Sequence, residues 1–192
     1  MVGVEQILAA AHSPSALVPL LFISLQGEPN ADNVQLCLTA INSLALQSET
    51  NKSLLGDYEA PYAVRLSMAR FSSHSKITEL ACAAIAGLAI DHQMNQSRFC
   101  IAGTGGEVPD TREQIVKIVE QSTDKEVQVN AMTAISALAM DNTENATILV
   151  KAGAKNAVET AMQKWSEDER VLTAGEIALQ ELFDAVEEDP SD

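Results

Sequence analysis

Hydrophobic and polar residues alternate along most of this 192-residue chain with the period of an α-helix. The stretch 125–140, KEVQVNAMTAISALAM, shows the pattern clearly. Its apolar positions follow the spacing i, i+4, i+7, i+8, i+11, which places them on one face of a helix: Val127, Ala131, Ala134, Ile135 and Leu138. We therefore expect a long helix here. The preceding residues predict a short helix at about 94–102 and a middle helix at about 111–122.

This pattern recurs along the chain. AIAGLAIDHQMNQSRFCIAG at 84–103 and AISALAMDNTENATILVKAG at 134–153 agree at eight of twenty positions. An Ala-Ile pair, degenerate in its last copy, recurs at spacings of 44, 50 and 44 residues: Ile41, Ile85, Ile135 and Leu179. An asparagine lies ten residues after each isoleucine: Asn51, Asn95 and Asn145. Such a period is typical of a solenoid, in which each unit buries its apolar face against its neighbours.

Helix-capping residues separate the expected helices. DTRE at 110–113 and TDKE at 123–126 have the form of a capping box, in which an oxygen-bearing side chain precedes a glutamate by three residues. Gly103 and Gly153 are expected to end short helices in the left-handed conformation. The asparagines of the repeat are expected to cap the starts of the short helices. Asp91 and Asp141 would oppose the dipole at the long-helix ends, so we expect them to cap the next helix instead.

These short–middle–long triplets resemble the armadillo repeat. The resemblance rests on the A-I-x-x-L-A pattern of the long helix, the asparagine of the short helix and the glycine after it. It covers almost the whole chain, with repeats at about 1–47, 48–91, 92–141 and 142–186 in one domain, followed by an acidic flexible tail at 187–192. The resemblance implies an all-α fold, a right-handed α-solenoid of about four three-helix repeats. It also implies a non-enzymatic domain that holds a peptide or protein in a concave groove lined by its long helices.

The groove positions differ from those of importin-α, the armadillo protein of nuclear import. That protein binds basic peptides with a ladder of Trp and Asn on its long helices. The corresponding residues here contain neither type: Thr39, Ser43, Ala83, Gly87, Thr133, Ala137, Ile177 and Glu181. Trp165 aligns with Phe71 on the middle helices, where we expect it to pack in the core. Without indole rings and amides to hold a lysine-rich peptide, the sequence does not support import-signal binding.

The side chains predicted to line the floor of the groove are instead small and nearly neutral. We assign Thr39, Ser43, Ala83, Gly87, Thr133, Ala137 and Glu181 as candidate protein-binding residues, which would suit a bulky, partly apolar partner. The alternative is that these positions form a solvent-covered face with no partner, and that their side chains are small only because of the curvature of the solenoid.

Composition and charge narrow the classes of partner. The chain carries 12 basic and 27 acidic residues, a net charge of −15, which disfavours nucleic acid and anionic membranes as partners. Its longest apolar run, ALVPLLFISL, is too short to span a bilayer. Cys37, Cys82 and Cys100 lie in apolar helical patterns, which favours buried thiols in a reducing compartment. We expect a cytoplasmic protein, with the nucleus or the cilium as alternatives.

No arrangement of residues indicates catalysis. TGGEVPD at 104–110 lacks the strand and the Lys-Ser/Thr of a phosphate-binding loop, so a surface loop is expected. His12, His74 and His92 have no nucleophile or metal ligand at a suitable spacing. We therefore expect no enzyme activity, no cofactor and no metal site.

The two ends of the chain differ. VEQILAAAHSPSALVPLLFISLQ, at 4–26, contains one charged residue, Glu5, whereas the last long helix mixes charged with apolar residues as a capping repeat does. The N-terminal end is thus expected to expose apolar surface for a second copy, another partner, or further repeats of a longer array. The sequence predicts a scaffold or adaptor that binds a protein or peptide. The alternative is a permanent structural subunit of a large cytoskeletal, ciliary or organelle assembly.

Overall fold

The computed structural model describes residues 2–100 and 109–187, and these residues form twelve helices. In chain order they are α1 (Val4–Ala10), α2 (Pro14–Leu25), α3 (Ala31–Gln47), α4 (Glu49–Asp57), α5 (Ala60–Arg70), α6 (Ser75–Ala89), α7 (Gln93–Cys100), α8 (Thr111–Gln121), α9 (Lys125–Ala139), α10 (Thr143–Lys151), α11 (Ala154–Lys164) and α12 (Glu169–Glu187). The described part of the chain contains no strand. The prediction of an all-α protein is confirmed.

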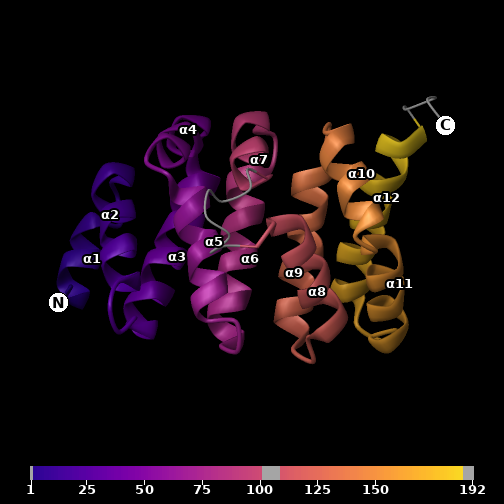
Figure 1. Cartoon of the computed structure of the whole chain (residues 1–192), viewed down its shortest axis with the longest axis horizontal. Coiled ribbons are helices and arrows are strands. Elements are labelled where there is room, and N and C mark those ends of the chain that lie inside the picture. The colour runs from indigo at the N-terminus through magenta and orange to yellow at the C-terminus, as the bar shows by residue number, and fades with distance from the viewer. Residues whose placement is uncertain (1, 101–108, 188–192) are drawn as a thin grey trace.

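The helices follow the order short, middle, long four times and stack along one axis from α1 to α12, with the two termini at opposite ends (Figure 1). The chain is an α-solenoid. The expected helices of the third repeat are confirmed as α7, α8 and α9, with boundaries within two residues of the prediction. The segment TGGEVPD falls largely on residues 101–108, which lie outside the described residues together with Gly103 and most of the acidic tail.

The apolar core runs the length of the stack between the helix layers. The anchors Ile41, Ile85 and Ile135 are completely buried, and Leu179 is half-buried on α12. Cys37 and Cys82 are buried as predicted, whereas Cys100 is half-buried. Burial raises the pKa of the Cys37 and Cys82 thiols to about 12 and that of Cys100 to about 11, so all three remain protonated at neutral pH. Trp165 and Phe71 both pack against the core, as expected.

Several capping predictions are confirmed. The Asp110 side chain accepts the backbone N–H of Arg112 at the start of α8. Gly153 has φ +96°, the left-handed conformation that ends α10. At α9 the prediction was wrong by one residue, since Asp124 rather than Thr123 caps the helix by accepting from the N–H groups of Glu126 and Val127. Aspartate shifts the cap because its carboxylate is the stronger acceptor.

The predicted starts of the short helices were wrong in a consistent way. The caps are Ser48 for α4, His92 for α7 and Asn142 for α10, each accepting the N–H of the repeat asparagine three residues on. Asp91 and Asp141 do not cap these helices. They adopt left-handed conformations, with φ of 52° and 49°, at the bends that follow α6 and α9.

The repeat asparagines lie one turn inside the short helices and bind the preceding long helix. The Nδ2 atoms of Asn51, Asn95 and Asn145 donate to the carbonyl oxygens of the leucines seven residues earlier, at 3.1, 3.0 and 2.9 Å. Those carbonyls belong to the last turns of α3, α6 and α9, where the helix itself supplies too few donors. The asparagine therefore fixes the bend between the long helix and the next short helix.

Candidate protein-binding face

The four long helices α3, α6, α9 and α12 lie side by side, and their exposed residues form what we call the long-helix face (Figure 1). Of the residues predicted to bind a partner, Thr39, Ser43 and Thr133 are exposed there. Ala83 and Glu181 are half-buried. The hydroxyls of Thr39 and Thr133 donate to the carbonyls of Gln35 and Val129, four residues earlier on their own helices. These five residues can meet a partner.

Gly87 and Ala137 have a different setting, because both are buried. A Cβ atom at Gly87 would stand 2.3 Å from Oδ1 of Asn42 on α3 and 3.7 Å from Cβ of Ala45. Glycine therefore lets α6 approach α3 closely. At Ala137 the exposed fraction is 2 %, and its carbonyl accepts from Nε2 of Gln96. The small size of these two residues serves helix packing, and neither offers side-chain surface to a partner.

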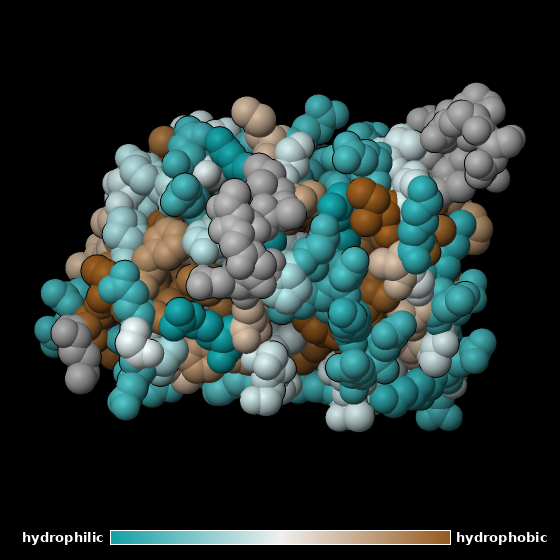
Figure 2. Space-filling model, viewed as in Figure 1, coloured by the Kyte–Doolittle hydropathy of each residue, from teal (hydrophilic) through white to brown (hydrophobic). Residues whose placement is uncertain are grey.

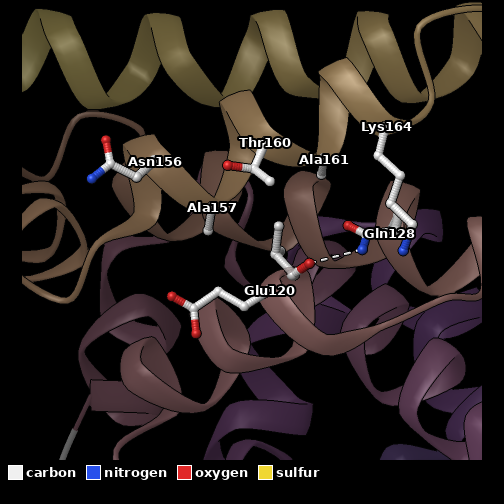
Figure 3. A pocket seen from close by; sticks show the side chains of 8 residues that line it. Glu120, Gln128, Asn156, Ala157, Thr160, Ala161 and Lys164 are labelled. Atoms are coloured by element: carbon white, nitrogen blue, oxygen red, sulfur yellow. Dashed lines mark hydrogen bonds between the residues drawn. The ribbon is translucent and has the colours of Figure 1, made fainter.

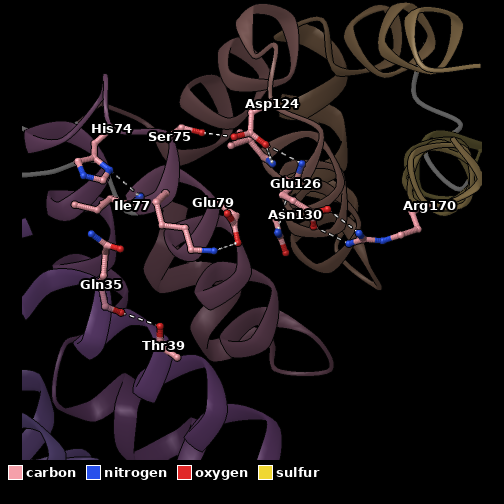
Figure 4. A network of polar contacts seen from close by, with 12 residues as sticks. Gln35, Thr39, His74, Ser75, Ile77, Glu79, Asp124, Glu126, Asn130 and Arg170 are labelled. Atoms are coloured by element: carbon pink, nitrogen blue, oxygen red, sulfur yellow. Dashed lines mark hydrogen bonds and ion pairs between the residues drawn. The ribbon is translucent and has the colours of Figure 1, made fainter. Parts of the chain in front are cut away.

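One edge of the long-helix face carries charges of alternating sign, and Figure 4 shows two of them, Glu126 and Arg170. The corresponding positions at the N-terminal ends of the long helices are Asp32, Lys76, Glu126 and Arg170. Sequence reasoning did not identify this row, although the 44, 50 and 44 spacing that aligns the isoleucines also aligns these four positions.

Ion pairs and hydrogen bonds neutralise much of this charged edge. Arg170 Nη1 and Nη2 donate to the two carboxylate oxygens of Glu126 at 2.7 and 2.8 Å, which joins α12 to α9. The bond from Arg170 lowers the pKa of the Glu126 carboxyl. Ser75 Oγ donates to Asp124 across α6 and α9, and this bond is the main cause that lowers the pKa of that carboxyl. Lys76 pairs with Glu79 on its own helix.

The opposite edge, where the long helices end, is apolar and acidic. Leu46 is 64 % exposed and Met94 is 63 % exposed. Met94 also lines a crevice of about 430 Å³ that has no Lys or Arg in its lining: Glu49, Asp91, His92, Gln93, Met94, Gln96, Met140 and Asp141. Between the two edges, the centre of the face carries the small and hydroxyl-bearing residues. A partner would thus meet a neutral centre with a charged row on one side and an apolar, acidic crevice on the other.

The contact between Ser53 and His92 beside this crevice is not arranged for general-base catalysis, because the ring nitrogen that faces the serine carries a proton. His92 Nδ1 accepts the backbone N–H of Asn95 at 3.2 Å. The proton of the neutral ring is therefore on Nε2, which lies 3.1 Å from Ser53 Oγ and 3.5 Å from Glu49 Oε1. A general base would need an unprotonated nitrogen facing the serine. The contact instead ties α4 to the start of α7.

No group of three or more His, Cys, Asp or Glu side chains in residues 2–100 and 109–187 could hold a metal ion. Within the same ranges, no helix is both long enough and apolar enough to cross a membrane.

Comparisons with known proteins support the fold. No family model and no curated protein matches the chain by sequence. Among solved structures, an engineered protein superposes with a TM-score of 0.73 at 22 % identity, covering 90 % of this chain and 63 % of its own. A designed armadillo repeat protein superposes with a TM-score of 0.72 at 25 % identity, covering 92 % of this chain and 67 % of its own. Another, solved in complex with a (KR)4 peptide, gives 0.68 at 22 % identity, with coverages of 92 % and 67 %. This chain spans about two thirds of the length of these structures.

Proposed function

We propose that this chain, which has a divergent armadillo-like repeat fold, is a non-enzymatic scaffold or adaptor that binds a partner protein or peptide on its long-helix face. The observation that carries the proposal is the alignment of four long helices, since Thr39, Ser43, Ala83 and Thr133 are exposed or half-buried positions on three of them. A rigid surface binds without first losing conformational entropy. A typical specific interface buries about 1,600 Å² in total, and a four-repeat face has room for that.

The chemistry of the face favours a partner with apolar or backbone surface at its centre. The hydrogens of the Thr39 and Thr133 hydroxyls are already donated within their own helices, so these residues offer methyl groups and acceptor lone pairs. The structural neighbour in complex with (KR)4 is compatible with peptide binding by such a fold. This chain lacks the Trp and Asn ladder of importin-α, so the partner we propose is not an import signal.

The test uses arginine substitutions at exposed positions, because Gly87→Arg or Ala137→Arg would disturb helix packing. Thr39→Arg and Thr133→Arg each place a bulky cation at the centre of the face. Gln163→Arg, at an exposed position on α11, makes the same neutral-to-cationic change on a middle helix. Partners captured from native extract would be compared for the wild type and the three variants, with their folding checked by circular dichroism.

The proposal requires that Thr39→Arg and Thr133→Arg lose the same partner at least ten-fold while Gln163→Arg retains it. Loss of that partner by Gln163→Arg alone would move the interface to the middle helices. Equal binding by all three variants would exclude the long-helix face as the interface.

A second function is favoured by the N-terminal repeat. Val4, Leu8 and Ile23 are 48, 56 and 49 % exposed, and residues 1–47 contain no basic residue. On the face that Figure 2 shows, apolar surface lies over the N-terminal helices, whereas the C-terminal half is mostly hydrophilic. A permanent subunit of a larger assembly would bury such an end against its neighbours or against a second copy. Such a subunit would aggregate when purified alone, whereas a scaffold would remain dispersed and bind reversibly.

We infer an intracellular setting, in the cytoplasm or with the nucleus or cilium as alternatives. This inference rests on three thiols that burial keeps protonated and that are not paired as disulfides.

A further inference from the structure

A hollow lies between the middle helices of the last two triplets, away from the long-helix face (Figure 3). Its volume is about 180 Å³, and it is lined from α8, α9 and α11 by Val119, Glu120, Gln128, Asn156, Ala157, Thr160, Ala161 and Lys164. A single water molecule occupies roughly 30 Å³ in the liquid, so the hollow has room for a larger group.

The Gln128 side chain forms the floor of this hollow and is 1 % exposed. Its Nε2 atom donates to the carbonyl oxygens of Val119 at 2.8 Å and Ser122 at 3.0 Å. These carbonyls lie at the C-terminal end of α8, where helical donors run out. Turning the amide over would place its oxygen against two carbonyl oxygens, so its orientation is fixed.

This fixed orientation leaves an acceptor without a donor. Gln128 Oε1 is buried and has no hydrogen-bond partner among the described residues. Figure 3 shows this oxygen on the side of the amide that faces α11. A buried polar atom without a partner is unfavourable, so a ligand that donates to it gains affinity over one that does not.

We propose that this hollow binds a primary carboxamide, the side-chain group of asparagine or glutamine on a partner protein. The carboxamide N–H donates to Gln128 Oε1. The carboxamide oxygen accepts from Lys164 Nζ, which lies beside the Gln128 amide because both donate to Ser122 O. Lys164 Nζ uses one of its three protons in that 3.3 Å bond and keeps two.

Groups of other charge fit less well. A carboxylate has no proton for Gln128 Oε1 and would face the Glu120 carboxylate at the rim. An ammonium group would supply protons but would be repelled by Lys164, and it has no acceptor for the free protons of that lysine. A carboxamide is neutral, and it carries both a donor for Gln128 Oε1 and an acceptor for Lys164 Nζ.

The test is binding of small probes of similar size to the whole ¹⁵N-labelled protein. Acetamide, acetate and ethylammonium would each be titrated while the side-chain amide signal of Gln128 and the backbone signals of α11 are followed. We expect a saturable shift with acetamide and an apparent dissociation constant at least ten-fold weaker for the two ions.

Two variants separate binding in the hollow from general effects. Thr160→Leu fills the hollow without touching the bonds of Gln128, and should abolish the saturable acetamide shift. Gln163→Leu makes a similar change at an exposed position one turn away on α11, and should retain it. A linear shift with acetamide would mean that ordered water alone satisfies Gln128, and would overturn the proposal. An equal response to all three probes, or an unchanged response in Thr160→Leu, would overturn it as well. None of these outcomes depends on the long-helix face.

Discussion

At the scale of the residue, the repeat asparagines show how one side chain can define a bend. Asn95 is completely buried and makes three side-chain contacts. Its Nδ2 atom donates to the carbonyls of Leu88 and Lys52, both at 3.0 Å, and its Oδ1 atom accepts from Arg98 at 3.2 Å. It therefore joins α6, α4 and α7. Asn51 occupies the same place in the preceding repeat but is only half-buried, with one such bond to Leu44.

The difference in burial predicts a difference in stability. Asn95→Ala leaves two buried carbonyls without their donor and should lower the free energy of unfolding by about 2–3 kcal/mol. Asn51→Ala removes the donor of one carbonyl, and because Asn51 is only half-buried water can take its place, so the change should cost about 1 kcal/mol. Urea unfolding followed by circular dichroism measures both values. Equal losses in the two variants would contradict the role assigned to burial.

At the scale of the element, the long helices end in a conformation that costs stability. Asp91 and Asp141 both have positive φ, where glycine or asparagine is preferred. Each also places a negative charge at a helix C-terminus, where the macrodipole disfavours it. Both acids line the crevice at the edge of the long-helix face, and local strain of this kind concentrates at functional sites.

Asp141→Asn removes the negative charge but keeps the backbone conformation, because asparagine also tolerates the left-handed conformation. The variant should be more stable than the wild type by about 0.3–1 kcal/mol, since it removes the unfavourable interaction with the dipole of α9. The gain should shrink in 1 M salt, where charges at the surface are screened. Thermal unfolding at low and high salt measures it. A gain that salt leaves unchanged would mean that the charge is not its cause.

The sequence predicted these elements better than the contacts between them. The apolar period located the helices because burial against neighbouring repeats imposes it on every helix. The repeat asparagines were recognised in sequence, but their role was misassigned, because the bond to a carbonyl seven residues earlier exists only once the chain has bent. Gly87 was assigned to the surface because one helix face looks the same whether solvent or a neighbouring helix lies beyond it. Its contact with Asn42 depends on the distance between α3 and α6, which local patterning does not encode.

At the scale of the whole molecule, each repeat contacts only its neighbours, so stability is distributed along the stack. The last triplet is held to the third through the core and through pairs at the edge of the long-helix face. Arg170 binds Glu126, and Lys125 Nζ lies 3.0 Å from Asp168 Oδ2. The described residues of α12 have a long helix on one side only, α9. Since α3 likewise has a long helix on one side only, α6, local opening should begin at an end of the described stack rather than in its middle.

Arg170→Ala tests both the locality and the pH dependence of this attachment. Hydrogen exchange in α12 should quicken, whereas exchange in α3 should stay unchanged. The pKa of Glu126 is lowered from its ordinary value of 4.5 in the folded protein, chiefly by its bond to Arg170. A lowered pKa stabilises the fold above 4.5, and this contribution is lost as the pH falls through the folded pKa. The difference in α12 exchange rate between wild type and Arg170→Ala should thus be largest at pH 7 and shrink below pH 4.5.

Glu169→Ala, at the exposed neighbouring position, serves as the control and should show no such pH-dependent difference. Faster exchange in α3 as well as α12 would show that the stack opens as one unit and would refute the nearest-neighbour description.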